Sequence, residues 1–192
     1  DAQIYAASDG SVQAAQSGKA TSSWGIAIRY KDIPIFSTGG AIQIRQSEES
    51  SLRAELQGLT ELYHILPQDI QPRIAVDNET AIQIHDKLFN PYTKELYPTV
   101  RGVYTYTQAV VQLHKAIQTR TRRFHLTHTH SHREKEHTNN KDLHERRQVL
   151  ATADTEAENS HSDHATQVQA EPFALWHNDH LIEKQATKIL KA

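Results

Sequence analysis

The spacing of apolar side chains switches between two periods along this chain, and the order of the switches restricts the fold more than any other feature. Residues 3–8, 23–30 and 33–44 alternate apolar side chains with small or polar ones, which predicts three antiparallel strands. Residues 50–66 then place leucines three or four positions apart, which predicts an amphipathic helix. A short apolar run at 73–76 predicts a fourth strand. This succession is typical of domains in which helices pack on a sheet.

The remaining elements continue that pattern. Helices are predicted at 79–88, 100–119 and 142–158, and a fifth strand at 122–128. Residues 10–22 combine Ser, Gly, Ala and Gln and are predicted to form a loop. The fold class that results is α/β: a five-stranded mixed sheet, with three antiparallel strands followed by parallel strands, flanked by helices.

A polar stretch at 159–170 separates the predicted sheet domain from the end of the chain. We therefore expect a domain at 1–158 and an appendage at 159–192, which would be a linker followed by a small hairpin and a short helix. The hairpin is expected within 173–182. The chain begins at Asp1 and contains no methionine, so we expect it to be a domain taken from a longer polypeptide.

The composition excludes several kinds of chemistry. The chain has no cysteine, which rules out disulfide bonds, thiolate metal sites and a thiol nucleophile. It contains no run of about 18 apolar residues, so no membrane span is predicted. Its net charge is −2, and the overall charge therefore does not by itself indicate a nucleic-acid-binding protein.

Four acidic residues stand at positions where an enzyme places functional groups. Asp9 and Asp77 are predicted at strand ends, Glu55 lies at the border of the apolar stripe of the first helix, and Asp154 lies in the last long helix. Acids at strand ends are not needed for packing, and several of them gathered together would repel one another unless cations offset the charge. Clustered carboxylates select Mg²⁺ or Mn²⁺, and two such ions could activate a water and stabilise the leaving oxygen of a phosphodiester.

Six sequence features occur in an order that resembles one enzyme family. They are Ser-Asp-Gly-Ser at 8–11, Trp-Gly-Ile-Ala at 24–27, Ser-Ser-Leu-Arg-Ala-Glu-Leu-Gln-Gly-Leu at 50–59, Val-Asp-Asn-Glu-Thr-Ala-Ile at 76–82, His132, and Ala-Thr-Ala-Asp-Thr-Glu-Ala at 151–157. The series resembles type 1 ribonuclease H. More narrowly, it is similar to the ribonuclease H domains that follow reverse transcriptase in eukaryotic retroelements. The similarity covers residues 3–158, and Arg-Ala-Glu-Leu and Ala-Asp-x-x-Ala are its most specific parts.

The resemblance implies a catalytic set and a reaction. Asp9, Glu55, Asp77 and Asp154 would hold two Mg²⁺ ions, with Mn²⁺ as a substitute, and the RNA strand of an RNA/DNA hybrid would be cleaved to leave a 3′-hydroxyl and a 5′-phosphate. His132 would assist proton transfer or product release from a mobile loop, with His130 as its rival. The residues implied to contact the nucleic acid are Gly10, Ser11, Ser51 and Asn78.

The resemblance also implies a context for the domain and one alternative ligand. The chain would be fused to a reverse transcriptase domain inside the cell, in the cytoplasm or the nucleus. Ser51 replaces the Asn of cellular ribonucleases H, and Glu79 replaces their Gln, so strictness for RNA is open. The segment between His132 and Asp154 is longer than in bacterial enzymes, and Asp142 is therefore a less favoured alternative to Asp154.

Two other functions fit parts of the sequence. Seven of the 13 histidines lie between residues 125 and 161, and His128, His130 and His132 would share one face of an extended segment. Three such imidazoles suit Zn²⁺ and favour, as an alternative, a histidine-liganded binuclear zinc hydrolase. The other alternative is a degenerate ribonuclease H-like scaffold that binds the hybrid without cleaving it.

Overall fold

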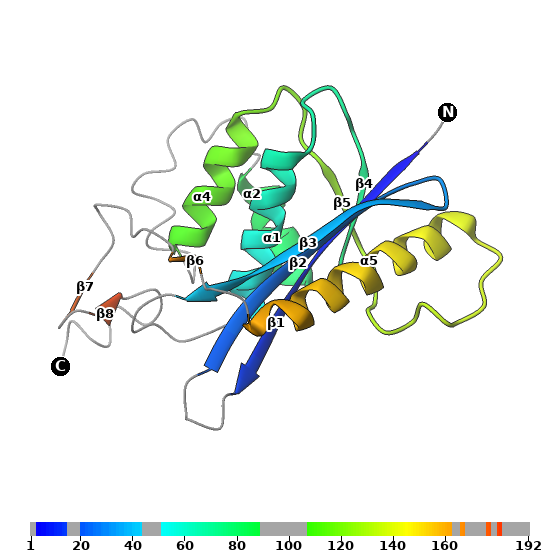
Figure 1. Cartoon of the computed structure of the whole chain (residues 1–192). Helices are drawn as coiled ribbons and strands as arrows, with labels where there is room; N and C mark the ends of the chain where they lie inside the picture. The colour runs from blue at the N-terminus through cyan, green and yellow to red at the C-terminus, as the bar shows by residue number, and fades with distance from the viewer. Residues whose placement is uncertain are drawn as a thin grey trace.

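The main sheet of the protein is assembled from strands that come from both halves of the chain. The computed structural model describes residues 3–14, 20–43, 51–88, 107–162, 166–167, 176–177 and 180–181. The strands of the sheet lie in the order β5-β4-β1-β2-β3-β6 (Figure 1). Their bounds are β1 (Ile4–Ala14), β2 (Ala20–Tyr30), β3 (Ile33–Gln43), β4 (Arg73–Val76), β5 (His125–His128) and β6 (Thr166–Gln167).

The pairing directions confirm the predicted five-stranded mixed sheet. Strands β1, β2 and β3 are antiparallel neighbours, β4 runs parallel to β1, and β5 runs parallel to β4. The two-residue strand β6 adds a sixth member, parallel to β3, within a stretch that the sequence predicts to be a linker. The expected hairpin is present as β7 (Trp176–His177) and β8 (His180–Leu181). The domain boundary at 158/159 stays a prediction.

The predicted loop at 10–22 is wrong at both ends. Strand β1 continues to Ala14 and β2 already begins at Ala20, with Ser11 opposite Ser23. Small polar side chains do not interrupt an antiparallel ladder, because the ladder is made by the backbone groups. Asp9 consequently lies inside β1, opposite Gly25, and not at a strand end as predicted.

The helices cover both faces of the sheet. They are α1 (Ser51–Ile65), α2 (Glu79–Leu88), α4 (Thr107–Gln118) and α5 (Lys141–Asn159), and a 3₁₀ turn follows at Ser160–Ser162. Helices α1, α2 and α4 lie on one face and α5 on the other (Figure 1). The predicted start of the third helix, at residues 100–106, lies outside the described residues. No helix in the described part of the chain is long and apolar enough to span a membrane.

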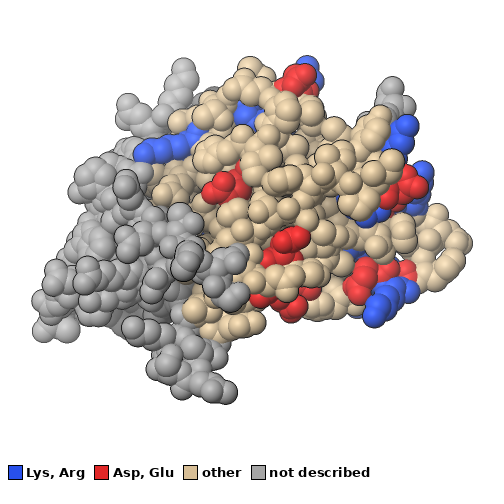
Figure 2. All heavy atoms as spheres, in the orientation of Figure 1, with Lys and Arg blue, Asp and Glu red and all other residues tan. Residues whose placement is uncertain are grey.

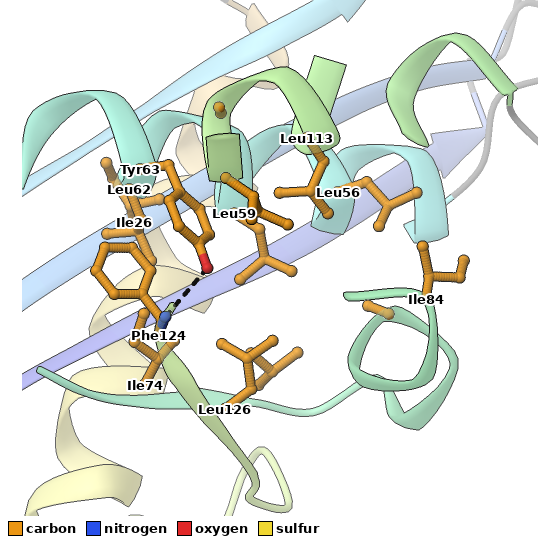
Figure 3. Packing of buried hydrophobic residues seen from close by; sticks show 14 of the residues in the cluster. Ile26, Leu56, Leu59, Leu62, Tyr63, Ile74, Ile84, Leu113, Phe124 and Leu126 are labelled. Carbon is orange, nitrogen blue, oxygen red and sulfur yellow. Dashed lines mark hydrogen bonds between the residues drawn. The ribbon is translucent and has the colours of Figure 1, made fainter. Parts of the chain in front are cut away.

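The strand alternation sorts large and small side chains to different faces. The face under α1 and α4 holds the larger core, where Ile26 and Ile74 pack with leucines of α1 and with Phe124 (Figure 3). The ring of Phe124 lies 4.1 Å from that of Tyr63, whose hydroxyl accepts a hydrogen bond from the Phe124 backbone N–H at 3.1 Å. Each fully buried Leu or Ile side chain contributes about 1.5 to 3 kcal/mol.

The opposite face is lined by alanines. Ala7, Ala27 and Ala75 of three adjacent strands pack against Val149, Leu150 and Ala153 of α5. Because these strand side chains are small, α5 can lie close to the sheet. This close approach brings Asp154 of α5 near Asp9 of β1.

Candidate active site

Four carboxylates that lie far apart in the sequence come together in the fold. Asp9 lies within β1, and Asp77 directly follows β4, the parallel neighbour of β1. Glu55 belongs to α1 and Asp154 to the second half of α5. The side chains of Glu55 and Asp154 lie close enough to the Asp9 carboxyl to shift its pKa, and Glu55 also experiences the charge of Asp77. The structure thus gathers all four acids that the sequence singled out.

Two glycines allow the helices to bring their acids this close to β1. A Cβ atom on Gly10 would lie 2.6 Å from the Ser51 carbonyl oxygen and 2.7 Å from the Glu55 backbone nitrogen, so only glycine lets α1 approach here. A Cβ atom on Gly25 would overlap the carbonyl oxygen of Ala153. Gly25 lies opposite Asp9 in the β1–β2 ladder. Because β2 has no side chain at this position, α5 can pack close enough to the sheet for Asp154 to interact with Asp9.

Burial raises the pKa values of the two most buried acids, Asp9 and Glu55. Asp9 is 8% exposed and Glu55 is 3% exposed. The pKa of Asp9 is raised to about 7, mainly by burial and also by Asp154, while the interactions with Glu55 and the Gly10 N–H oppose the rise. Burial and then the charge of Asp9 raise the pKa of Glu55 well above its ordinary value. All four acids are charged together only after protons have left both groups, and a bound cation would favour that loss.

The donor set fits a divalent cation. Glu55 Oε2 is buried and has no hydrogen-bond partner among the described residues, an arrangement that costs free energy unless something binds there. Asp77 and Asp154 keep 33% and 21% of their side chains exposed, so the cluster opens to solvent on their side. Carboxylate oxygens are the ligands that Mg²⁺ and Mn²⁺ prefer.

The raised pKa of Asp9 predicts that the metal-free protein loses stability as the pH rises. The carboxyl has a pKa of 3.8 when unperturbed and about 7 in the fold. Between these values the folded state retains a proton that the unfolded chain has released, so the free energy of unfolding falls by up to about 4 kcal/mol from pH 4 to pH 7. Urea unfolding in EDTA measures this fall.

Asp9→Asn isolates this contribution from the titration of the histidines. The variant is expected to match the wild type near pH 4 and to be more stable above pH 7, because asparagine remains neutral. A difference between the two proteins that does not change with pH would contradict the assignment.

Comparison with solved structures identifies the fold. No family model and no curated protein matches the sequence. The solution structure of the PFV RNase H domain superposes with a TM-score of 0.57 at 15% identity, over 84% of this chain and 95% of that one. LC11-RNase H1 in complex with an RNA/DNA hybrid gives a TM-score of 0.51 at 15% identity, over 83% and 96% of the two chains. The chain has the ribonuclease H-like fold.

A larger protein contains the same fold as one of its parts. The Prototype Foamy Virus Protease-Reverse Transcriptase matches with a TM-score of 0.56 at 10% identity, over 84% of this chain. This chain spans only 21% of the length of that protein. At these identities the comparisons establish the ribonuclease H-like fold, and the chemistry has to be argued from the side chains.

The two candidate histidines of this ribonuclease H-like domain lie beside different acids. His132 is 73% exposed, has a positive φ of 56°, and places Nδ1 3.5 Å from Asp154 Oδ2. His130 packs edge-on against His128, with ring centroids 4.6 Å apart, and belongs with His128 and Asp77 to a group whose potential ligand atoms lie within 4.8 Å of one another. The three imidazoles expected to form one zinc site are therefore divided between two places.

The residues implied to contact nucleic acid have different surroundings. Gly10 lies against α1, and Ser51 is exposed at the first position of that helix. The Ser11 hydroxyl lies 2.9 Å from Nε2 of His161. Asn78 directly precedes α2, and its Oδ1 accepts backbone hydrogen bonds at 3.0 and 3.2 Å from the first turn of that helix. Of the four, Ser51 is the residue that the described structure leaves most open to solvent.

Asp142 does not belong to the carboxylate cluster. Its carboxylate accepts hydrogen bonds from Tyr5 at 3.1 Å and from Arg146 at 2.9 Å, and it is also paired with Arg73. These contacts hold the first turn of α5 against the sheet. The predicted alternative to Asp154 is therefore wrong, because Asp142 is committed to ion pairs at the other end of the helix.

Sequence reasoning missed the residues that hold Asp77. The Ser131 hydroxyl donates a hydrogen bond to Asp77 Oδ2 at 2.5 Å, and His128 Nε2 lies 3.0 Å from the Asp77 carbonyl oxygen. The pairing of Val76 with His128 in the β4–β5 ladder places these groups side by side. No spacing in the sequence reveals this pairing, because it joins segments about fifty residues apart.

Proposed function

We propose that this chain is a metal-dependent ribonuclease H, an endonuclease that hydrolyses the RNA strand of RNA/DNA hybrids. The observation that carries the proposal is the convergence of four carboxylates, with the buried Glu55 Oε2 atom left without a hydrogen-bond partner. The fold supports it, since one structure with this fold is that of LC11-RNase H1 in complex with an RNA/DNA hybrid. We further propose that the chain is fused to a retroelement reverse transcriptase, for which the foamy viral protease-reverse transcriptase offers a structural parallel.

The four acids differ in burial, and each would be a ligand of the metal ions that the proposal requires. Asp9, Glu55, Asp77 and Asp154 would hold two Mg²⁺ ions, with Mn²⁺ as a substitute. When bound, such ions activate a water and stabilise the leaving oxygen of the phosphodiester. Asp9 would be the central ligand of the cluster, because its carboxyl interacts with both Glu55 and Asp154. Asp77 and Asp154 are partly exposed and form the side from which a phosphate can enter.

The charge of this domain bears on how tightly it would bind a hybrid. On the face drawn in Figure 2, the Lys and Arg side chains of the described residues are scattered and form no broad basic patch. The net charge of −2 agrees with that view. Because neutralisation of phosphates supplies much of the affinity for nucleic acids, we infer weak, salt-sensitive binding by this domain alone and a large contribution from the fused partner.

A cleavage assay with labelled substrates tests the proposal. We expect hydrolysis of the RNA strand of a hybrid in Mg²⁺, with double-stranded RNA and double-stranded DNA left intact, and loss of hydrolysis in Asp77→Asn because one metal ligand becomes neutral. Binding of the hybrid without cleavage would instead support the degenerate scaffold. Hydrolysis that requires Zn²⁺ would support the histidine-liganded hydrolase.

His132 is expected to assist the reaction without being indispensable. Its imidazole lies 3.5 Å from Asp154 and is exposed, so it can exchange protons with solvent while remaining beside the acids. His132→Ala should slow turnover by about a hundredfold, the ordinary contribution of one general acid or base. Single-turnover and steady-state rates separate slow chemistry from slow product release. An unchanged rate would transfer the role to His130.

A further inference from the structure

The ends of β4 and β5 hold a second group of potential metal ligands that the four-carboxylate cluster does not account for. Asp77 follows β4 directly, His128 is the last residue of β5, and His130 lies two positions further. One potential ligand atom from each of the three residues lies within 4.8 Å of the other two. Among the described residues this is the group that meets such a criterion, and it combines two imidazoles with one carboxylate.

The surroundings of these side chains match those of metal ligands. Asp77 Oδ2 is held by the Ser131 hydroxyl at 2.5 Å, which leaves Oδ1, 3.6 Å from His128 Nε2, to face the histidine. Both nitrogens of His128 lie near oxygen acceptors, Nε2 near the Asp77 carbonyl at 3.0 Å and Nδ1 near Glu79 Oε1 at 3.6 Å. If Nδ1 binds an ion, Nε2 keeps the Asp77 carbonyl oxygen as the acceptor for its proton, the usual support of a metal-bound histidine.

The exposure of His130 gives an ion access to the group, and the three ligands together favour one type of ion. His130 is exposed, so an ion can reach the group from solvent. Two imidazole nitrogens and one carboxylate oxygen suit Zn²⁺ and related transition-metal ions far better than Mg²⁺, which prefers oxygen ligands alone. Three protein ligands leave the fourth position of a tetrahedral ion to water.

We propose that Asp77, His128 and His130 form a binding site for one transition-metal ion of the Zn²⁺ type, separate from the proposed Mg²⁺ cluster but sharing Asp77 with it. A carboxylate that binds Zn²⁺ beside two histidines is withdrawn from the Mg²⁺ cluster. Zn²⁺ therefore acts as an inhibitor that competes for Asp77. The inhibition rests on the proposed function, whereas the binding of Zn²⁺ does not.

Calorimetric titration of the whole, EDTA-stripped chain with ZnCl₂ tests the site. Wild type is expected to show one site that His130→Ala weakens by at least about tenfold, because a ligand is lost. His132→Ala is the matched control, since it also removes one exposed histidine of the same segment but leaves the three ligands in place. Glu55→Gln should likewise retain the site, because Glu55 belongs only to the carboxylate cluster.

The outcomes separate this proposal from the proposed ribonuclease activity. Equal affinity in wild type and His130→Ala, equal loss in His132→Ala, or no Zn²⁺ binding by wild type would each overturn the site. In the cleavage assay, His130→Ala should raise the Zn²⁺ concentration that halves its own Mg²⁺-dependent rate by at least about tenfold. If the chain cleaves no hybrid, the proposed function fails, and the titration still decides whether the zinc site exists.

Discussion

Asp9→Asn is expected to reduce cleavage of the RNA strand by about a thousandfold or more while the fold persists. The Asp9 carboxyl interacts with those of Glu55 and Asp154, so its replacement would remove the central ligand of the cluster. Loss of several kcal/mol of metal-dependent transition-state stabilisation corresponds to this decrease, because each 1.36 kcal/mol changes the rate about tenfold. Single-turnover cleavage of a labelled hybrid in Mg²⁺ measures the effect, and circular dichroism verifies the fold.

Asp142→Asn provides the matched control for Asp9→Asn. It removes the same charge from a partly buried aspartate, but its partners are Arg73, Arg146 and Tyr5 and not the carboxylate cluster. We expect cleavage close to that of wild type, with some loss of stability at the start of α5. If Asp142→Asn loses as much activity as Asp9→Asn, the cluster described here is not the catalytic centre.

Gly25→Ala is expected to destabilise the protein by about 3 kcal/mol and to impair cleavage. The added methyl group would overlap the Ala153 carbonyl oxygen and lie 2.5 Å from the Ala157 backbone nitrogen. Both atoms belong to the backbone of α5, which must move away as a whole because a helix cannot yield locally without losing hydrogen bonds. Displacement of Asp154 by about 1 Å is enough to cost roughly a hundredfold in rate.

Gly40→Ala tests whether the effect is specific to the position at which α5 packs against β2. A Cβ atom there would meet ring atoms of Trp24 at 3.0 to 3.1 Å, and a side chain can adjust where a helix backbone cannot. Urea unfolding of both variants, with cleavage rates measured in parallel, gives the comparison. If Gly25→Ala proves as stable and as active as Gly40→Ala, then the packing of α5 on β2 does not depend on the missing side chain of Gly25.

The two histidine alternatives illustrate where sequence patterns stop being informative. An extended strand would place His128, His130 and His132 on one face. The strand ends at His128, and a turn with a positive φ at His132 then directs that residue toward Asp154. The chain leaves the β-conformation within this segment, and a period-two rule cannot apply beyond the end of the strand.

Local patterns in the sequence were sufficient to predict the order of the elements and to single out the four acids. Apolar periodicity depends on local geometry, so it predicted the five main strands and the helix that carries Glu55, and the motif order pointed to Asp9, Asp77 and Asp154. The groups that surround those acids depend on how the strands and helices pack in three dimensions. The β4–β5 pairing brings Ser131 and His128 to Asp77, and the missing side chain of Gly25 lets α5 bring Asp154 to Asp9. Such contacts join segments that are distant in the sequence, and they depend on strand register and interlayer distance, which no local pattern encodes.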